Sequence, residues 1–278
     1  MKLYRTPRGI LLYHQNRYFI NTDLEWDELV NQSNLFKKID EQFKNWEELE
    51  DGAELLHSEL LPPIGHQEVW ASGVTYYRSR DARMEESKEA GGGSFYDRIY
   101  DADRPELFFK ATAARTVGHG DQVRIRQDSS WNVPEPELTL FINSQGNIQG
   151  YTIGNDMSSR SIEGENPLYL PQAKSYRGSC AIGPCLFITD RPFSEDADIH
   201  LTIRRGEEVA FRDETQVNQI KRKFADLVSY LYREMDFPSG CYLMTGTGII
   251  PDNDFTLQSG DEVSITIEPI GTLTNTVE

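Results

Sequence analysis

The sequence predicts a β-rich α+β fold, and two observations support this prediction. From Val69 onward, short runs with strand-like composition alternate with Gly- and Pro-containing segments. A single clear amphipathic helix interrupts these runs, which differs from the regular alternation of strands and helices in a parallel α/β sheet. The expected strands are Leu138–Ile142, Ile148–Ile153, Cys185–Thr189, Ile199–Arg204 and Val263–Ile267.

The amphipathic helix is expected over residues 217–231. Its apolar residues recur at helical spacing, with Lys, Arg and Asp between them. The residues on this apolar face are Val217, Ile220, Phe224, Leu227, Val228 and Leu231.

Residues 1–62 are expected to form a small N-terminal α+β domain. They begin with two strand-like pieces, residues 11–14 and 17–20, and two helical patterns follow. In the second pattern, Phe43, Trp46 and Leu49 recur at helical spacing. Pro62 and Pro63 then stop any helix, so we place the boundary there and expect a larger domain over residues 63–278.

The composition narrows the classes of function. Hydrophobic residues make up 38% of the 278 residues, enough for a real core, and the net charge is -17. Such an acidic chain repels phosphate backbones and anionic membranes, so we expect neither nucleic acid nor membrane partners. An odd count of three cysteines and the lack of a leader-like or membrane-spanning apolar run suggest a cytoplasmic protein.

A polar, charged segment from Arg78 to Asp103 contains the run Gly91-Gly92-Gly93-Ser94. This composition suits a mobile flap over a site. An ordinary surface loop explains it equally well.

The stretch from Val133 to Leu138 is the most informative part of the chain. Its prolines favour an extended backbone, in which residues two apart point to the same face, so Glu135 and Glu137 project together. Two adjacent carboxylates repel each other, and a hard divalent cation such as Mg²⁺ removes that conflict. A solvated strand face is the alternative, since acidic pairs are common on surfaces.

A third carboxylate can be placed by strand register. The run from Asn143 to Asn147 is a turn signal between two apolar runs, so a hairpin is expected. If the turn centres on Gln145, Glu135 faces Asn155 and Asp156 lies next to it. Three carboxylates then converge at the open end of one hairpin, which predicts a metal site.

At these residues the sequence resembles the fumarylacetoacetate hydrolase family, and within it the 2-keto-3-deoxy-D-arabinonate dehydratases. The resemblance extends from about Val69 to the C-terminus. The stretch from Glu165 to Lys174 is its most specific part. The other matching segments are Tyr100–Ala102, Arg104–Thr112, Val117–Gly120, Pro134–Leu138, Gly150–Ile153, Asp156 and Thr245–Thr247.

The resemblance implies a multi-layered β-roll preceded by a small N-terminal domain, and a homodimer or homotetramer. It also implies Mg²⁺ as the cofactor, with Mn²⁺ or Ca²⁺ as possible substitutes. The implied roles are metal ligation by Glu135, Glu137 and Asp156, catalysis by Glu106 and Lys174, and substrate binding by Thr247. Ser72 and Lys110 are further candidates for substrate binding, although a structural role is the preferred explanation for Lys110.

The expected activity is dehydration of a 2-keto-3-deoxy sugar acid to a dioxo acid. A 2-oxo acid can chelate one metal ion, which stabilises the enolate formed when a C3 proton leaves. A carboxyl group in a partly dry pocket, here Glu106, can act as base and then as acid for the C4 hydroxyl. Glu106 could instead be an ion-pair partner of Arg104 or Lys110, and Lys174 could be a surface lysine.

Two other functions compete with this one. A hydrolase or decarboxylase of an acylpyruvate-like diketone would belong to the same family, but the family's hydrolases activate water with a His–Glu pair near the flap. No histidine lies between His66 and His119 in this chain. A non-catalytic sugar-acid binding protein is the third possibility. The segment after Gly73 differs from related dehydratases, which leaves substrate length and stereochemistry open.

Overall fold

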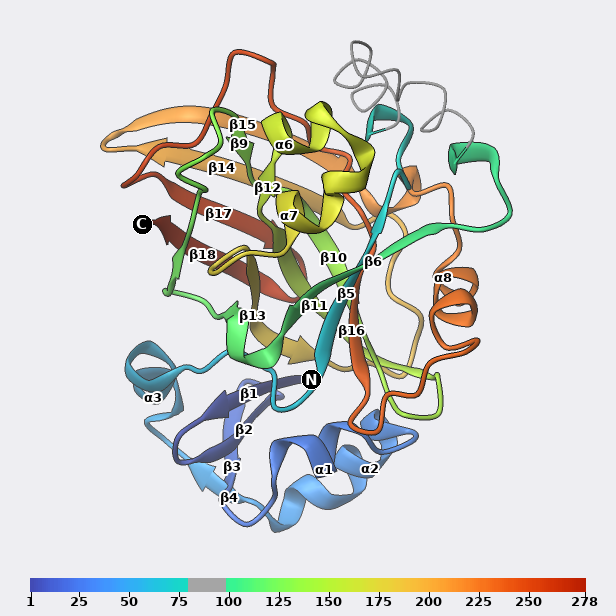
Figure 1. Cartoon of the computed structure of the whole chain (residues 1–278). Helices are drawn as coiled ribbons and strands as arrows, with labels where there is room; N and C mark the ends of the chain where they lie inside the picture. Colours follow the sequence, from blue (N-terminus) through green and yellow to red (C-terminus); the bar gives the residue numbers. More distant parts are fainter. Residues whose placement is uncertain (80–98) are drawn as a thin grey trace.

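The computed structural model describes residues 1–79 and 99–278, and these are dominated by two large sheets (Figure 1). The strands of the larger sheet are β1 (Lys2–Thr6), β2 (Gly9–His14), β3 (Arg17–Asn21), β4 (Glu47–Leu49), β5 (Glu68–Gly73), β6 (Glu106–Thr112), β7 (Thr116–Val117), β10 (Pro136–Ile142), β11 (Ile148–Asp156), β13 (Cys180–Phe187) and β16 (Cys241–Met244). Their order is β4-β3-β2-β1-β13-β11-β10-β16-β5-β6, with β7 beside β13.

The second sheet has five strands in the order β15-β14-β17-β18-β8, and a further pair lies beside the helices near the site. The five strands are β8 (Gln122–Val123), β14 (Asp198–Arg205), β15 (Glu208–Gln216), β17 (Glu262–Ile267) and β18 (Gly271–Val277). The pair consists of β9 (Asn132–Val133) and β12 (Ser158–Ser159).

Helices are short in the described part of the chain. Those with both ends inside the described residues are α1 (Trp26–Val30), α2 (Leu35–Gln42), α3 (Gly52–Glu59), α6 (Arg160–Glu165), α7 (Leu170–Lys174) and α8 (Phe224–Leu231). Single 3-10 turns occur at Phe43–Asn45, Ala113–Arg115, Pro167–Tyr169 and Val217–Gln219. None of the helices in residues 1–79 and 99–278 is long and apolar enough to cross a membrane.

The main hydrophobic core joins the two large sheets. Leu138 and Leu140 of β10 pack in one cluster with Leu201 of β14 and Ile265 of β17. Phe141, on the opposite face of β10, belongs to a second cluster, so β10 is buried on both faces. Glu135 and Glu137 lie on the same face as Phe141, which places these carboxylates in the interior.

The second cluster contains the N-terminal elements. Leu3 of β1 and Leu35 of α2 share it with Phe141 and with Tyr242 of β16. β1 pairs antiparallel with β13, and Leu3 lies opposite Leu186. The sheet therefore continues from the first residues into the strands that carry the site. Figure 1 shows α1 and α2 packed at the end of the molecule that holds the N-terminal strands. The expected domain boundary at residue 62 stays a prediction. The larger sheet and the second core cluster both contain residues from either side of it.

The β-rich α+β fold is confirmed. The expected strands within β10, β11, β14 and β17 lie where the sequence placed them, with small differences at the ends. The strand expected at Cys185–Thr189 is longer at its start and shorter at its end, and forms β13.

The helix expected around Phe43, Trp46 and Leu49 was a wrong prediction. A 3-10 turn covers Phe43–Asn45, Trp46 is extended, and β4 follows. β4 pairs with β3, with Leu49 opposite Tyr18, so strand pairing replaces the helical hydrogen bonds. Phe43 and Trp46 are still buried, because the turn directs both rings into the second core cluster.

The helix expected over residues 217–231 is real only in its second half, α8. Before it, Ile220 forms a bridge with Tyr76, and the backbone N–H of Lys221 donates to the carbonyl of Thr75 at 3.0 Å. These backbone groups are therefore bonded to a distant segment, which interrupts the helix that the apolar spacing predicted. The glycine run of the expected flap, residues 91–94, lies outside the described residues.

Leu3→Ala tests how tightly the N-terminal strands are coupled to the rest. Leu3 is fully buried, so the substitution should lower the free energy of unfolding by about 2–5 kcal/mol. We expect one cooperative transition in denaturant, shifted as a whole, when circular dichroism and tryptophan fluorescence are followed together. Lys37→Ala on the exposed side of α2 is the control. Separate transitions, with only one of them shifted, would instead support an independent N-terminal domain.

Candidate active site

The hairpin of β10 and β11 brings the three predicted carboxylates together. Pro136 lies opposite Asn155, and the backbone N–H of Asp156 donates to the carbonyl of Glu135 at 2.9 Å. Glu135 therefore faces Asp156 itself, one residue away from the expected partner. The cause is a register shift between Phe141 and Ile142, next to the turn, which the sequence did not reveal.

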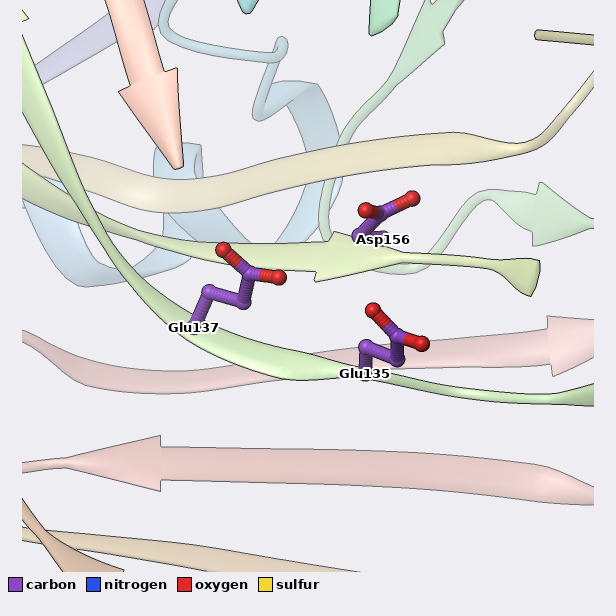
Figure 2. A group of neighbouring side chains, drawn as sticks. All are labelled: Glu135, Glu137 and Asp156. Carbon is purple, nitrogen blue, oxygen red and sulfur yellow. The ribbon is translucent and has the colours of Figure 1, made fainter. Parts of the chain in front are cut away.

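The three carboxylates form a compact buried group. Each of Glu135, Glu137 and Asp156 offers an oxygen, and these oxygens lie within 4.8 Å of one another. The residues are only 4%, 1% and 0% exposed. Figure 2 shows Glu135 and Glu137 projecting from the same side of one strand towards the end of the strand that carries Asp156. The predicted convergence is observed, and an acidic pair on a solvated strand face is ruled out by the burial.

Glu137 shows the electrostatic cost of this arrangement most clearly. Burial raises the pKa of its carboxyl well above the usual value, and the negative charges of Asp156 and Glu135 raise it further. Lys174 and the backbone N–H of Gly246 act in the opposite direction. This N–H donates to Glu137 Oε2 at 2.5 Å. Gly246 has φ of 96°, and a Cβ there would lie 2.0 Å from Thr75 Oγ1, so glycine is required for this approach.

Lys174 is a buried cation of the site, not a surface lysine. Its Nζ donates to Glu135 Oε2 at 2.6 Å, Asp156 Oδ2 at 3.1 Å and Ser158 Oγ at 2.6 Å. The residue is 2% exposed and ends the short helix α7, which contacts β6 and β12. The Phe108 ring lies 5.7 Å from Nζ. Lys174 thus bridges two carboxylates from opposite strands of the hairpin.

Two further cations contact the second oxygen of Glu135 and of Asp156, the oxygen that Lys174 does not contact. Arg160, at the start of α6, donates to Glu135 Oε1 at 2.9 Å. Lys110 of β6 forms an ion pair with Asp156 Oδ1 and donates to the carbonyls of Met157, at 2.9 Å, and Lys174. With its side chain buried and directed at these groups, Lys110 supports Asp156 from behind the cavity. The proposed contact of Lys110 with substrate is not supported by this placement.

The other predicted residues line one small cavity together with the triad. Glu106 lies at the start of β6, opposite Gly73, and a Cβ on Gly73 would lie 2.0 Å from Glu106 Oε2. Ser72 donates to the carbonyl of Glu106 at 3.0 Å. Thr247 exchanges hydrogen bonds with Ile249 through its hydroxyl. The predicted residues that line the cavity are Ser72, Glu106, Glu135, Glu137, Asp156, Lys174 and Thr247.

Comparison with known proteins agrees with this geometry. Residues 82–278 match the family model described as the C-terminal part of fumarylacetoacetate (FAA) hydrolase. The chain belongs to the fumarylacetoacetate hydrolase family. It is 50% identical over 216 residues to a probable 2-keto-3-deoxyxylonate dehydratase from Haloferax volcanii, a match that covers 77% of this chain and 73% of the relative. It is also 45% identical over 223 residues to the 2-dehydro-3-deoxy-D-arabinonate dehydratase of Saccharolobus solfataricus, over 79% of this chain and 74% of the relative.

A solved structure in the family extends the comparison to the whole chain. The 2-keto-3-deoxy-D-arabinonate dehydratase complexed with magnesium and 2,5-dioxopentanoate is 35% identical. It superposes with a TM-score of 0.86 and covers 100% of this chain and 99% of its own. The fumarylacetoacetate hydrolase-like β-roll that the resemblance implied is therefore confirmed.

The donor set of this family member fits a divalent metal ion. Of the described cavity-lining residues, five carry carboxylates and two, Arg160 and Lys174, carry positive charge, while Lys110 adds a third cation from behind. With every group ionised, these residues have an excess of two negative charges, which one divalent cation neutralises. Oxygen ligands without Cys or His suit Mg²⁺, Mn²⁺ or Ca²⁺.

The sequence reasoning missed Arg160, Glu163 and Ser158. All three follow Asp156 within a few residues, and each is buried at 2% or less. Arg160 and Glu163 lie on α6, where their one-turn spacing looks like the charged face of a surface helix. Their nearness in sequence to a predicted ligand was the available signal. Sequence alone does not show that this helix faces inwards.

His66 and His119 flank the segment near the flap in which the family's hydrolases carry their catalytic histidine, and both make contacts away from the triad. His66 pairs with Asp27 in the N-terminal part, and His119 Nδ1 accepts the backbone N–H of Thr274 at 3.1 Å. Neither residue is among the described residues that line the cavity.

Metal binding at the triad should release a proton from Glu137. The raised pKa of Glu137 means that its carboxyl holds a proton at a pH where an ordinary glutamate is ionised, whereas a metal ligand must be a carboxylate. The affinity for Mn²⁺ should therefore increase with rising pH up to that raised pKa and then level off. Calorimetric titration in two buffers of different ionisation enthalpy measures the released proton. Binding heats that are independent of buffer at mildly acidic pH would contradict this assignment.

Proposed function

We propose that this protein is a magnesium-dependent hydro-lyase that removes water from a 2-keto-3-deoxy sugar acid and yields a dioxo acid. The observation that carries the proposal is a single cavity that combines a buried acidic triad with Glu106 and Lys174. Similarity to sugar-acid dehydratases, one of them solved with magnesium and 2,5-dioxopentanoate, supports the same reaction.

Glu135, Glu137 and Asp156 are the proposed metal ligands. A bound divalent ion would supply the positive charge that polarises the keto group of a 2-oxo acid and stabilises its enolate. The protein contributes the fixed positions of the three carboxylates. Arg160 and Lys110 limit the movement of two of these side chains by holding one oxygen of each.

Glu106 is the proposed acid and base. It belongs to the same cavity as the triad but is not one of the three clustered carboxylates. As a base it would remove a proton from C3, and as an acid it would return a proton to the hydroxyl that leaves C4. The 2-oxo-3-ene acid formed in this way would become the dioxo acid when a proton moves from C5 to C3 and the resulting 5-enol ketonises. Gly73 leaves the room in which the Glu106 carboxyl lies. The β5–β6 pairing fixes the backbone of Glu106 opposite Gly73.

Lys174, Ser72 and Thr247 are proposed to contact the substrate. Lys174 would place its positive charge near the developing enolate oxygen. Ser72 and Thr247 line the cavity from β5 and from the segment after β16, and their hydroxyls suit the carboxylate or hydroxyl groups of a sugar acid. Lys110 is better explained as a support for Asp156 than as a substrate contact.

A hydrolase or decarboxylase of an acylpyruvate-like diketone is the weaker candidate. A hydrolase requires a group that activates water, for which the family uses a His–Glu pair near the flap. The described cavity residues include no histidine, and residues 80–98 contain none in sequence. A cytoplasmic location and a homodimeric or homotetrameric assembly stay predictions from sequence.

Removal of metal should abolish the activity. We expect the chain to convert 2-keto-3-deoxy acids of five carbons to a dioxo acid in the presence of Mg²⁺, which can be followed by NMR. Treatment with EDTA should stop the reaction, and Mg²⁺ or Mn²⁺ should restore it because the triad then regains its cation. Full turnover by thoroughly metal-stripped protein would contradict the proposed mechanism.

Glu106→Gln should separate binding from chemistry. Glutamine keeps the shape of the side chain but carries no transferable proton, so turnover should fall by about 10²–10⁴-fold while Mn²⁺ affinity is unchanged. Exchange of the C3 proton with solvent should fall in parallel if Glu106 is the base, and persist if it is only the acid. Glu163→Gln, in the same cavity, is the matched comparison. A larger loss of exchange in that variant than in Glu106→Gln would move the acid/base role to Glu163.

A further inference from the structure

Lys174 occupies a special place among the cations of the site. Its ammonium group lies between Glu135 and Asp156 and contacts one oxygen of each, Oε2 at 2.6 Å and Oδ2 at 3.1 Å. These two residues come from opposite strands of the hairpin, and both belong to the proposed metal ligands. A positive charge of the protein therefore bridges two of the three carboxylates that a metal ion would bridge.

The other two cations differ in which oxygens they contact. Arg160 contacts Oε1 of Glu135, and Lys110 contacts Oδ1 of Asp156. Both of these contacts are to oxygens other than Oε2 of Glu135 and Oδ2 of Asp156. The two remaining oxygens are the ones that Lys174 contacts. A metal ion bound through these two oxygens would compete with the Lys174 ammonium for them.

We infer that Lys174 is an exchangeable counter-ion of the metal site: it holds the triad together without metal and must give up Glu135 and Asp156 when a divalent ion binds. The inference rests on the proposed metal site, but it does not depend on which reaction the protein catalyses. Like-charge repulsion opposes simultaneous occupancy of the same oxygens by an ammonium group and a divalent ion. Binding is therefore an exchange of one cation for another.

The surroundings of Lys174 suit such an exchange. Its third contact is the hydroxyl of Ser158, which is not a carboxylate and does not have to be given up. Ser158 in turn donates to the carbonyl of Asp156 at 2.8 Å, so it is fixed in place. Lys174 also lines the cavity together with Phe108, Ser72 and Thr247. Release from the triad therefore leaves its charge on the cavity side, where the anionic substrate is proposed to bind.

The exchange predicts an increase in metal affinity when Lys174 is neutralised. Methionine has similar length but no charge, so Lys174→Met should bind Mn²⁺ at least about tenfold more tightly than the wild type at the same pH, measured by calorimetry, because a competing unit charge is removed. Without metal, the same variant should melt at a lower temperature than the wild type, because two buried carboxylates lose their shared counter-ion. Saturating Mg²⁺ should raise its melting temperature by more than it raises that of the wild type.

Arg160→Met is the matched control, because it also removes a buried cation bonded to Glu135. Arg160 contacts Oε1 of Glu135, not the Oε2 that Lys174 contacts, so this variant should not bind Mn²⁺ more tightly. Lys37→Met, an exposed site on α2, controls for long-range charge. Unchanged or weaker binding by folded Lys174→Met would overturn the inference, and so would an equal increase in both buried-cation variants, which would indicate a general charge effect.

A measurement on the wild-type protein remains decisive if Lys174→Met does not fold. The ¹⁵Nζ resonance of Lys174 can be assigned with the Lys174→Arg variant. When Mg²⁺ alone is added, this resonance should shift and the Nζ protons should exchange faster with solvent, because two hydrogen bonds to carboxylates are lost. An unchanged resonance at saturating Mg²⁺ would overturn the inference. Neither experiment uses substrate, so an absence of dehydratase activity would overturn the proposed function and leave this result standing.

Discussion

The mutual repulsion of three buried carboxylates is the constraint on which the rest of the site depends. Glu135, Glu137 and Asp156 lie within reach of one ion and are almost completely removed from water. Such a group is unstable in a protein interior unless positive charge is supplied nearby. The raised pKa of Glu137 is a direct sign of this cost, since protonation is one way to relieve it.

The surrounding elements supply the missing charge at well-defined points. Lys110 arrives on β6, Arg160 at the start of α6, and Lys174 at the end of α7, so three separate segments each contribute one cation. Each cation contacts a different set of oxygens of Glu135 and Asp156, and the backbone N–H of Gly246 contacts the third carboxylate, Glu137. The remaining excess of negative charge matches a single divalent ion. A bound divalent ion would itself be the local positive centre that an anionic substrate requires in this acidic protein.

The fold makes this possible because β10 is buried on both of its faces. One face packs in the core between the two large sheets, and the other carries Phe141 into the second core and the carboxylates into the site. β1 extends the same sheet on the far side of β13, so the N-terminal strands and the site-bearing strands belong to one continuous sheet. Stability of the N-terminal part and geometry of the site are therefore physically linked.

Local signals in the sequence determined the part of this protein that depends on neighbouring residues. The prolines around Glu135 and Glu137 imposed an extended chain, and the turn at Asn143–Asn147 imposed a hairpin that brought Asp156 near them. The strands β10, β11, β13, β14 and β17 followed from composition for the same reason. The tertiary structure alone decided the exact register, the strand in place of a helix at Glu47–Leu49, the interruption before α8, and the burial of Arg160, Lys110 and Lys174. Those outcomes depend on backbone pairing and charge contacts between segments far apart in the chain, and a lysine or arginine has the same local pattern whether it faces water or a buried carboxylate.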